Sequence, residues 1–253
     1  MISVDRVYQK VLAIANKEQR GYITPQEFNL FAAHAQMDIF EQYFYDINQW
    51  SRLPGNSHSY ADMLENVEQK ISYFKVYDAS VVPGGSGDVT YNNNEVYRLG
   101  EVKVRYSSNN TSSGKSIAER IKLEDHQLYL DSKLAKENYK RPIYWQRSDP
   151  TQAGTVRIRI YPKPMPTVDD VLLTYIRKPL DPKWTYLVTV ANPGSPVALY
   201  NPANDTQNFE LEASEESELI HRILAYSGIT LQRPEITQAA IQLESQKIQQ
   251  EKQ

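Results

Sequence analysis

The pattern of apolar and polar positions changes its period near residue 75. Before that point apolar residues recur three and four positions apart, which predicts helices over about 4–18, 24–50 and 60–74. Thr24, Pro25 and Glu27 give the clearest start signal, because Thr and Glu can exchange hydrogen bonds and Pro suits the first helical position. Residues 1–74 are therefore expected to form part of a helical bundle, with the second helix as its spine.

From Lys75 onward apolar and polar residues alternate, which is typical of half-exposed strands. Two segments place apolar residues on one face and basic residues on the other: Val102 and Val104 against Lys103 and Arg105, and Val156, Ile158 and Ile160 against Arg157 and Arg159. Further strands are expected over 143–146, 171–177 and 186–190, within the same sheet. Residues 75–211 are thus predicted to form a β-rich domain, a sandwich- or barrel-like antiparallel sheet with a short helix between 124 and 135.

Two helices are expected after residue 211. Ser214 is the predicted cap of the first, whose first turn is acidic, and Gly228 is its predicted end. Pro234 opens the second, which becomes polar on nearly every face from Glu244 and is expected either to fray or to lie against another chain. Residues 212–253 are expected to return to the bundle and dock to a partner, which completes an α+β fold.

A proline-bracketed arm follows the strand that is expected to end at Arg177. Pro179 and Pro182 have no backbone donor, so this segment is predicted to be a stiff, extended connector that ends at Trp184. Two interpretations are open. The arm grips a neighbouring chain, or it is an ordinary loop whose Trp184 packs on its own core.

Composition and charge narrow the classes of function. The chain has 253 residues, with 18 Tyr against 6 Phe, and tyrosine suits both assembly surfaces and half-exposed strands. A net charge of -3 argues against general electrostatic binding of nucleic acid. The basic stretch 98–122 and the acidic stretch 205–218 suit docking between copies or, alternatively, two solvated faces. No secretory signal or membrane span is predicted, which favours synthesis in the cytosol.

Motifs that would indicate chemistry are weak. There is no Cys, and Gly114-Lys115-Ser116 lacks the leading glycine of a phosphate loop. The four histidines are far apart, and Asp169-Asp170 is typical of a solvated turn. We therefore expect no catalytic residue, no cofactor and no metal site. An enzyme is the minor alternative, because the two carboxylates of a catalytic pair can be far apart in the sequence and meet only in the folded chain.

Three segments carry a resemblance to a known family: Gly21-Tyr-Ile-Thr-Pro-Gln-Glu-Phe-Asn29, Tyr175-Ile-Arg-Lys-Pro-Leu-Asp-Pro-Lys-Trp184, and Phe209-Glu-Leu211 with Leu219-Ile-His-Arg-Ile-Leu-Ala-Tyr-Ser-Gly228. They resemble the head-to-tail connector, or ring, proteins of short-tailed bacteriophages, particularly the crAss-like phages. The polar segment 107–116 and the glutamine-rich end depart from that family.

The resemblance implies a structural virion protein made in the host cytoplasm. It implies a ring of about twelve copies that links the portal to the tail. Its partners would be further copies, the portal, and adjacent ring or tail proteins, and genome DNA would pass through the channel without sequence-specific binding. The alternative is a host-surface or glycan-binding tail component, in which Tyr and Trp rings stack on sugars.

Together with the arm, the resemblance predicts a set of residues that contact other subunits or partners. The set comprises Arg177, Lys178, Pro179, Pro182, Trp184, Ile236, Leu243 and Ile248. The first five belong to the arm and its approach, and the last three belong to the apolar positions of the expected C-terminal helix.

Overall fold

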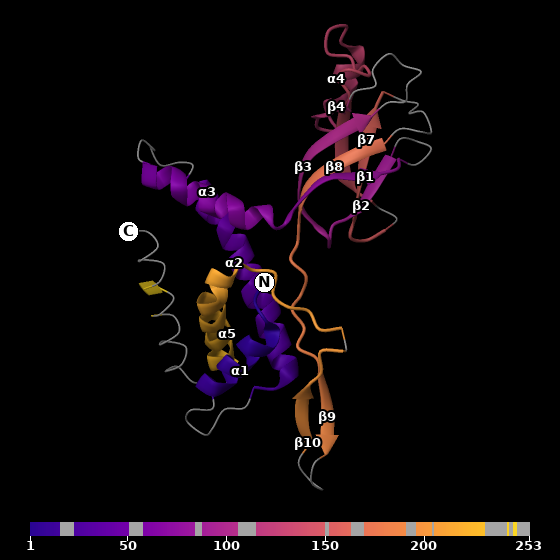
Figure 1. Ribbon diagram of the computed structural model, residues 1–253. Coiled ribbons are helices and arrows are strands. Elements are labelled where there is room, and N and C mark those ends of the chain that lie inside the picture. The colour runs from indigo at the N-terminus through magenta and orange to yellow at the C-terminus, as the bar shows by residue number, and fades with distance from the viewer. Residues whose placement is uncertain are drawn as a thin grey trace. The chain divides into compact units, whose positions relative to one another are not determined.

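The structure is a computed structural model that describes residues 1–15, 23–50, 58–83, 88–105, 115–149, 152–162, 170–190, 196–203, 205–230, 242 and 245–246. The chain forms two compact units (Figure 1). The helical unit comprises Met1–Lys70 and Pro179–Gln253, and the β unit comprises Ile71–Lys178. Residues 179–211, expected in the β-rich domain, thus fall in the helical unit, because the segment that begins at Pro179 is hydrogen-bonded to side chains of a helix in that unit.

The helical unit is built on α1 (Val4–Ala15), α2 (Pro25–Trp50) and α5 (Glu216–Thr230), with α3 (His58–Ser72) following α2. The three N-terminal helices confirm the predicted periodicity. Apolar side chains of α1, α2 and α5 are fully buried together, among them Val7, Val11, Phe28, Phe40, Leu219 and Ile223. α5 contacts both α1 and α2, so the C-terminal part returns to the bundle as expected.

The predicted start of α2 is confirmed in its hydrogen bonds. The backbone N–H of Thr24 donates to Glu27 Oε2 at 3.0 Å, and the Glu27 N–H donates to Thr24 Oγ1 at 3.3 Å. These reciprocal bonds satisfy two donors that a helix start leaves unpaired. The bonds from Thr24 also lower the pKa of the Glu27 carboxyl.

The β unit contains two four-stranded sheets. The first has the order β1-β8-β3-β4, with β1 at Lys75–Val81, β8 at Asp170–Arg177, β3 at Val96–Arg105 and β4 at Lys115–Ile117. The second has the order β2-β7-β6-β5, with β2 at Asp88–Asn92, β7 at Thr155–Tyr161, β6 at Ile143–Ser148 and β5 at Glu119–Arg120. A short helix, α4 (His126–Asp131), lies between β5 and β6 in the chain.

The two sheets share one apolar core. It gathers Val89, Tyr144, Ile158 and Ile160 from the second sheet with Val102, Val104, Val171 and Leu173 from the first. The β unit is therefore a sandwich and not a closed barrel, and the α+β class is confirmed. The expected antiparallel pairing holds except for the two-residue β5, which pairs in parallel with β6.

The basic outer faces expected for these strands are partly neutralised within the unit. Arg157 donates to Asp149 at 2.6 Å, and Arg159 makes two bonds to Asp88 at 2.6 and 2.7 Å. Hydrogen bonding to Asp88 raises the pKa of Arg159 further. On the first sheet Lys103 pairs with Asp78 at 3.1 Å. These arginines and this lysine pair with carboxylates of the same unit and do not form a uniform basic surface.

A separate two-stranded hairpin lies in the helical unit. β9 (Tyr186–Val190) pairs antiparallel with β10 (Pro196–Tyr200), and neither strand joins a larger sheet in the described part of the chain. The prediction that 186–190 belongs to the main sheet is therefore wrong. β10 was not predicted, because the prolines on both sides of it indicated turns.

The start and end of α5 differ from the predicted ones. A 3₁₀ turn, Ala213–Glu215, precedes the helix with Glu212 at its cap, and no side-chain cap bond forms there, so Ser214 is not the cap. The helix also continues through Gly228 to Thr230. A glycine costs only about 1 kcal/mol inside a helix, which the packing of α5 on the bundle outweighs. The helix expected from Pro234 lies almost wholly outside the described residues.

Three carboxylates before and within α5 are largely buried, with basic partners on α1, on α3 and on α5 itself. Glu215 pairs with Lys70, Glu218 bonds to Arg222 at 2.6 Å, and Glu216 accepts from Lys10 at 2.7 Å and also from Arg6. All three carboxylates are at most 9% exposed. Both interpretations of the acidic stretch, a solvated face and a docking face, are therefore wrong for these three residues. Their charges stabilise contacts inside the helical unit.

Acid is expected to weaken the helical unit through Glu216. Burial acts to raise the pKa of this carboxyl, but the bonds from Lys10 and Arg6 outweigh burial, and the pKa lies below its usual value. The stabilisation is therefore present above that value and is lost as the pH falls through the lowered pKa. Urea denaturation at a series of pH values should show stability falling in acid, and Glu216→Gln should reduce that dependence. Glu65→Gln, at an exposed position of α3, is the control; an equal change in both variants would contradict the assignment.

Among the described residues, no helix combines the length and the apolar character needed to cross a membrane.

Candidate interaction site

The arm, residues 179–184, lies along α2 and is held by two side chains of that helix. Asn29 bonds to Trp184, and Gln36 bonds to Leu180. Asn29 and Gln36 are seven residues apart, which is about two helical turns, so both project from one face of α2. Because the later arm residue meets the earlier helix residue, the arm runs antiparallel to α2.

The first attachment is a closed triangle of three hydrogen bonds. Gln36 Nε2 donates to the Leu180 carbonyl at 2.8 Å, the Leu180 N–H donates to Glu210 Oε2 at 2.8 Å, and the Glu210 N–H donates to Gln36 Oε1 at 3.0 Å. Gln36 is only 1% exposed. A buried amide whose donor and acceptor are both used fixes one geometry, so the triangle sets the position of Leu180.

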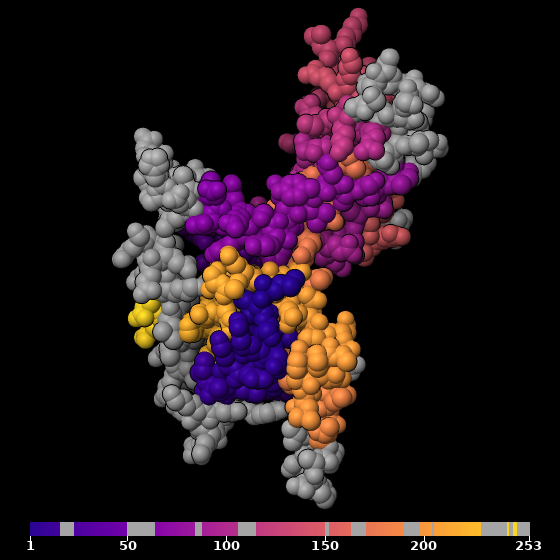
Figure 2. Space-filling view, viewed as in Figure 1, coloured from indigo at the N-terminus to yellow at the C-terminus, as the bar shows by residue number. Residues whose placement is uncertain are grey.

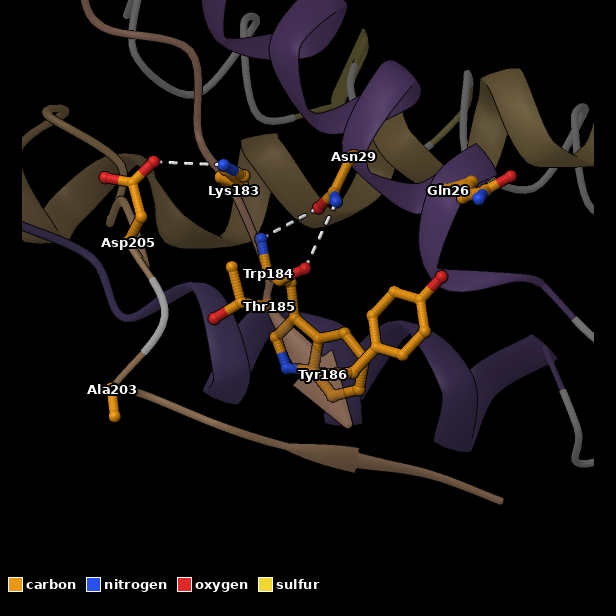
Figure 3. Close-up of a pocket in the computed structure, with 8 residues that line it drawn as sticks. All are labelled: Gln26, Asn29, Lys183, Trp184, Thr185, Tyr186, Ala203 and Asp205. Carbon is orange, nitrogen blue, oxygen red and sulfur yellow. Dashed lines mark hydrogen bonds and ion pairs between the residues drawn. The ribbon is translucent and has the colours of Figure 1, made fainter. Parts of the chain in front are cut away.

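The second attachment holds the backbone of Trp184 (Figure 3). The Trp184 N–H donates to Asn29 Oδ1 at 2.8 Å, and Asn29 Nδ2 donates to the Trp184 carbonyl at 3.2 Å. The indole Nε1 donates to Asp5 of α1 at 3.0 Å. All three polar groups of Trp184 are therefore satisfied within the helical unit, by two different helices.

Aromatic rings surround the indole. The Tyr8 ring centroid lies 4.3 Å from that of Trp184, and Tyr186 and Tyr200 lie in stacked orientations at 5.7 and 5.8 Å. Trp184 is 4% exposed. The structure thus places Trp184 in the core of its own unit, which is the second of the two interpretations of the arm, and leaves little of its surface for another chain.

The other predicted contact residues fall into three groups. Pro179 and Pro182 are buried, like Trp184. Arg177 and Lys178 are half-buried in the β unit, where their N–H groups donate to Phe74 at 2.9 Å and Glu95 at 2.8 Å. Ile236, Leu243 and Ile248 lie outside the described residues. The arm is therefore attached to α2 of its own unit. Its exposed side chains are those of Leu180, Asp181 and Lys183.

The hairpin that follows the arm is fixed at its base. Tyr186 and Tyr200 are opposite each other in the register and both stack on Trp184. One pair earlier, the Asn201 N–H donates to the Thr185 carbonyl at 2.9 Å. Since an isolated two-stranded hairpin is marginally stable in water, this anchoring to α1 and α2 through Trp184 is what keeps the two strands in place.

Beyond its base the hairpin presents apolar side chains to solvent. Leu187, Val188 and Leu199 are 52%, 59% and 53% exposed, and Leu187 faces Leu199 across the strands. Figure 2 shows the hairpin, in orange, on the surface of the helical unit beside α1. The sequence reasoning missed these residues. A usable signal was present, because residues 184–204 contain no charged side chain in a chain that is 23% charged.

An open hollow of about 660 Å³ lies beside the arm (Figure 3), lined by Gln26, Asn29, Lys183, Trp184, Thr185, Tyr186, Ala203 and Asp205. Lys183 and Asp205 pair at its margin at 3.0 Å. Stacking on a sugar requires a free aromatic face, and Trp184 is too deeply buried to supply one.

No group of three or more His, Asp or Glu that could hold a metal ion occurs among the described residues.

No protein-family model matches the chain, and no curated protein sequence is significantly similar to it.

Proposed function

We propose that the protein is a structural virion component that assembles into a ring of the head-to-tail connector of a short-tailed phage, linking the portal to the tail around the genome channel. The observation that carries the proposal is the hairpin: an uncharged, solvent-exposed apolar element whose base stacks on Trp184, which is in turn hydrogen-bonded to two helices. A surface of this kind is typical of a contact that is completed by another chain.

The distribution of charge supports contacts between copies. The β unit carries 17 Lys and Arg against 12 Asp and Glu, whereas the helical unit carries 11 against 19. A ring closes through a heterologous contact, in which one surface of each subunit meets a different surface of the next. Units of opposite net charge favour such a contact over one between identical surfaces, which would place like charges together.

The attachment of the arm supports the same role. A closed ring tolerates little variation in the angle between subunits, so the contacting element must be held in one orientation. The arm is held at one end by the three hydrogen bonds around Gln36 and at the other end by the two hydrogen bonds between Asn29 and Trp184. It leads directly into the hairpin. By the family resemblance, the ring has about twelve copies and binds the portal and adjacent ring or tail proteins.

The test is assembly of the purified full-length chain, alone and with the portal protein of the same phage. We expect a ring in negative-stain images and a corresponding mass by light scattering. We also expect weaker assembly at high salt, because opposite net charges are screened. A chain that stays monomeric at all concentrations, with and without the portal, would overturn the proposal.

A further inference from the structure

The outward-facing backbone groups of the hairpin can be assigned from one hydrogen bond. The Asn201 N–H donates to the Thr185 carbonyl, so residues 185 and 201 form a hydrogen-bonded pair. Such pairs alternate along an antiparallel ladder with pairs whose N–H and C=O groups point away from the partner strand. By the observed register the outward pairs are Tyr186 with Tyr200, Val188 with Ala198, and Val190 with Pro196.

The position of Pro196 agrees with this assignment. Proline has no N–H. At an outward position no N–H is needed for the hydrogen bonds between the two strands of the hairpin. The outer edge of β9 consequently offers three N–H groups, on Tyr186, Val188 and Val190, whereas the outer edge of β10 offers two, on Ala198 and Tyr200. No other strand pairs with either edge in the described ranges of the chain.

These two edges lack the protection that the other sheet edges have. Charged residues and bulges on edge strands prevent pairing with other chains. β4 carries Lys115, β2 begins with Asp88, and β5 consists of Glu119 and Arg120. β1 carries a bulge between Val76 and Ala79, with Asp78 at a φ of 50°. β9 and β10 carry no charge, no bulge and only one proline.

We propose that the outer edge of β9 pairs with the outer edge of β10 of a second copy, so that the hairpin sheet continues from one subunit to the next. The inference rests on the proposed ring. A second copy fits because the same hairpin supplies both free edges, and repetition of a β9-to-β10 contact around an axis is the heterologous arrangement that a ring needs. The absence of charge also fits, since identical copies then bring no like charges together.

Side-chain exposure is consistent with this partner. Leu187, Val188 and Leu199 are about half-exposed in the single chain, and the side chains of strands added on either side would reduce that exposure. The pairing is short, because Pro196 limits the β10 edge to Ala198 and Tyr200. It therefore sets the register between subunits, while the larger contact area must come from other surfaces of the two units.

The test uses Val188→Pro in the full-length chain, with Val188→Ala as the matched control. Both variants lose the valine side chain, but only proline removes the outward N–H, and neither removes a bond inside the hairpin. We expect Val188→Pro to weaken self-association at least about tenfold relative to Val188→Ala. Hydrogen exchange should also show protection of residues 186–190 on assembly of the unmodified chain. The Trp184 contribution to the fluorescence, taken as the difference from a matching chain with Trp184→Phe, reports whether the variant hairpin is still folded, because Trp184 stacks on the hairpin base.

The outcomes separate this inference from the proposed function. If the unmodified chain forms rings and Val188→Pro forms them equally well with a folded hairpin, the strand pairing is wrong and the ring remains. If the hairpin of Val188→Pro is unfolded, the test is hydrogen exchange at residues 186–190 of the unmodified chain. Exchange that is no slower in the ring than in the monomer overturns the pairing. Flotation of a monomeric unmodified chain with neutral phosphatidylcholine vesicles would identify lipid as the occupant and overturn it as well.

Discussion

Trp184→Ala is expected to lower the free energy of unfolding of the helical unit by about 3–5 kcal/mol, the range for removal of a buried aromatic side chain. The variant would leave a cavity between Tyr8, Tyr186 and Tyr200 and would remove the donor that bonds to Asp5. Because Trp184 joins α1 to the hairpin base, the same change should free the hairpin from the helices. Urea denaturation followed by helical circular dichroism measures the loss.

Two variants define what Trp184 contributes. Trp184→Phe retains a stacking ring but loses the bond to Asp5, so it should cost less than the alanine variant. Leu180→Ala changes an arm residue that is 55% exposed and should stay within about 0.5 kcal/mol of the unmodified chain. If Trp184→Ala were as mild as Leu180→Ala, while subunit contact was lost, Trp184 would be a contact residue for another chain and the arrangement described for the arm would be wrong.

Features set by local sequence were predicted correctly. The start of α2 depends on Thr24, Pro25 and Glu27, which interact within one turn, and its cap forms as expected. β7 (Thr155–Tyr161) contains the predicted alternation of Val156, Ile158 and Ile160 with Arg157 and Arg159, and this alternation runs without interruption through the strand. In both cases the interactions that decide the structure lie within a few residues of one another in the chain.

Features set by distant contacts were not predicted. β9 has the alternation of a sheet strand, but alternation does not identify the partner, and Tyr186 is fixed by Trp184 and by Tyr200 across the hairpin. Likewise, Glu216 is followed by no local basic partner, and its cations come from α1, more than 200 residues earlier. Such pairs meet only when the chain is folded.

The candidate site was located only in part. The prolines correctly predicted an extended arm that ends at Trp184, yet its contact with α2 depends on Asn29 and Gln36, whose polar side chains looked unremarkable in the second helix. The exposed hairpin was missed because β10 is flanked by prolines. The stretch around it contains no charged residue. This absence of charge indicates a contact surface only when both strands are known to be edge strands, because charged residues usually protect such strands from pairing.

Gln36→Leu is expected to destabilise the helical unit by about 2–3 kcal/mol, although leucine is similar in size and more apolar. The reason is that the substitution removes the donor to the Leu180 carbonyl and the acceptor of the Glu210 N–H at a position that is 1% exposed, and the loss of a hydrogen-bond partner at a buried site costs more than the bond itself contributes. Gln26→Leu, at an exposed position of the same helix, is the matched control and should change stability by no more than about 0.5 kcal/mol.

A double-mutant cycle with Glu210→Ala tests whether the triangle acts as one unit. Gln36 holds the Leu180 carbonyl and the Glu210 carboxylate holds the Leu180 N–H, so the loss of either contact releases the same arm residue. The second substitution then removes a smaller part of the remaining stabilisation. The double variant should lose about 1 kcal/mol less free energy of unfolding than the sum of the losses in the two single variants. Strictly additive losses would mean that Gln36 and Glu210 stabilise separate parts of the helical unit. The arm would then be positioned mainly by Trp184, and the assembly of Gln36→Leu should equal that of the unmodified chain.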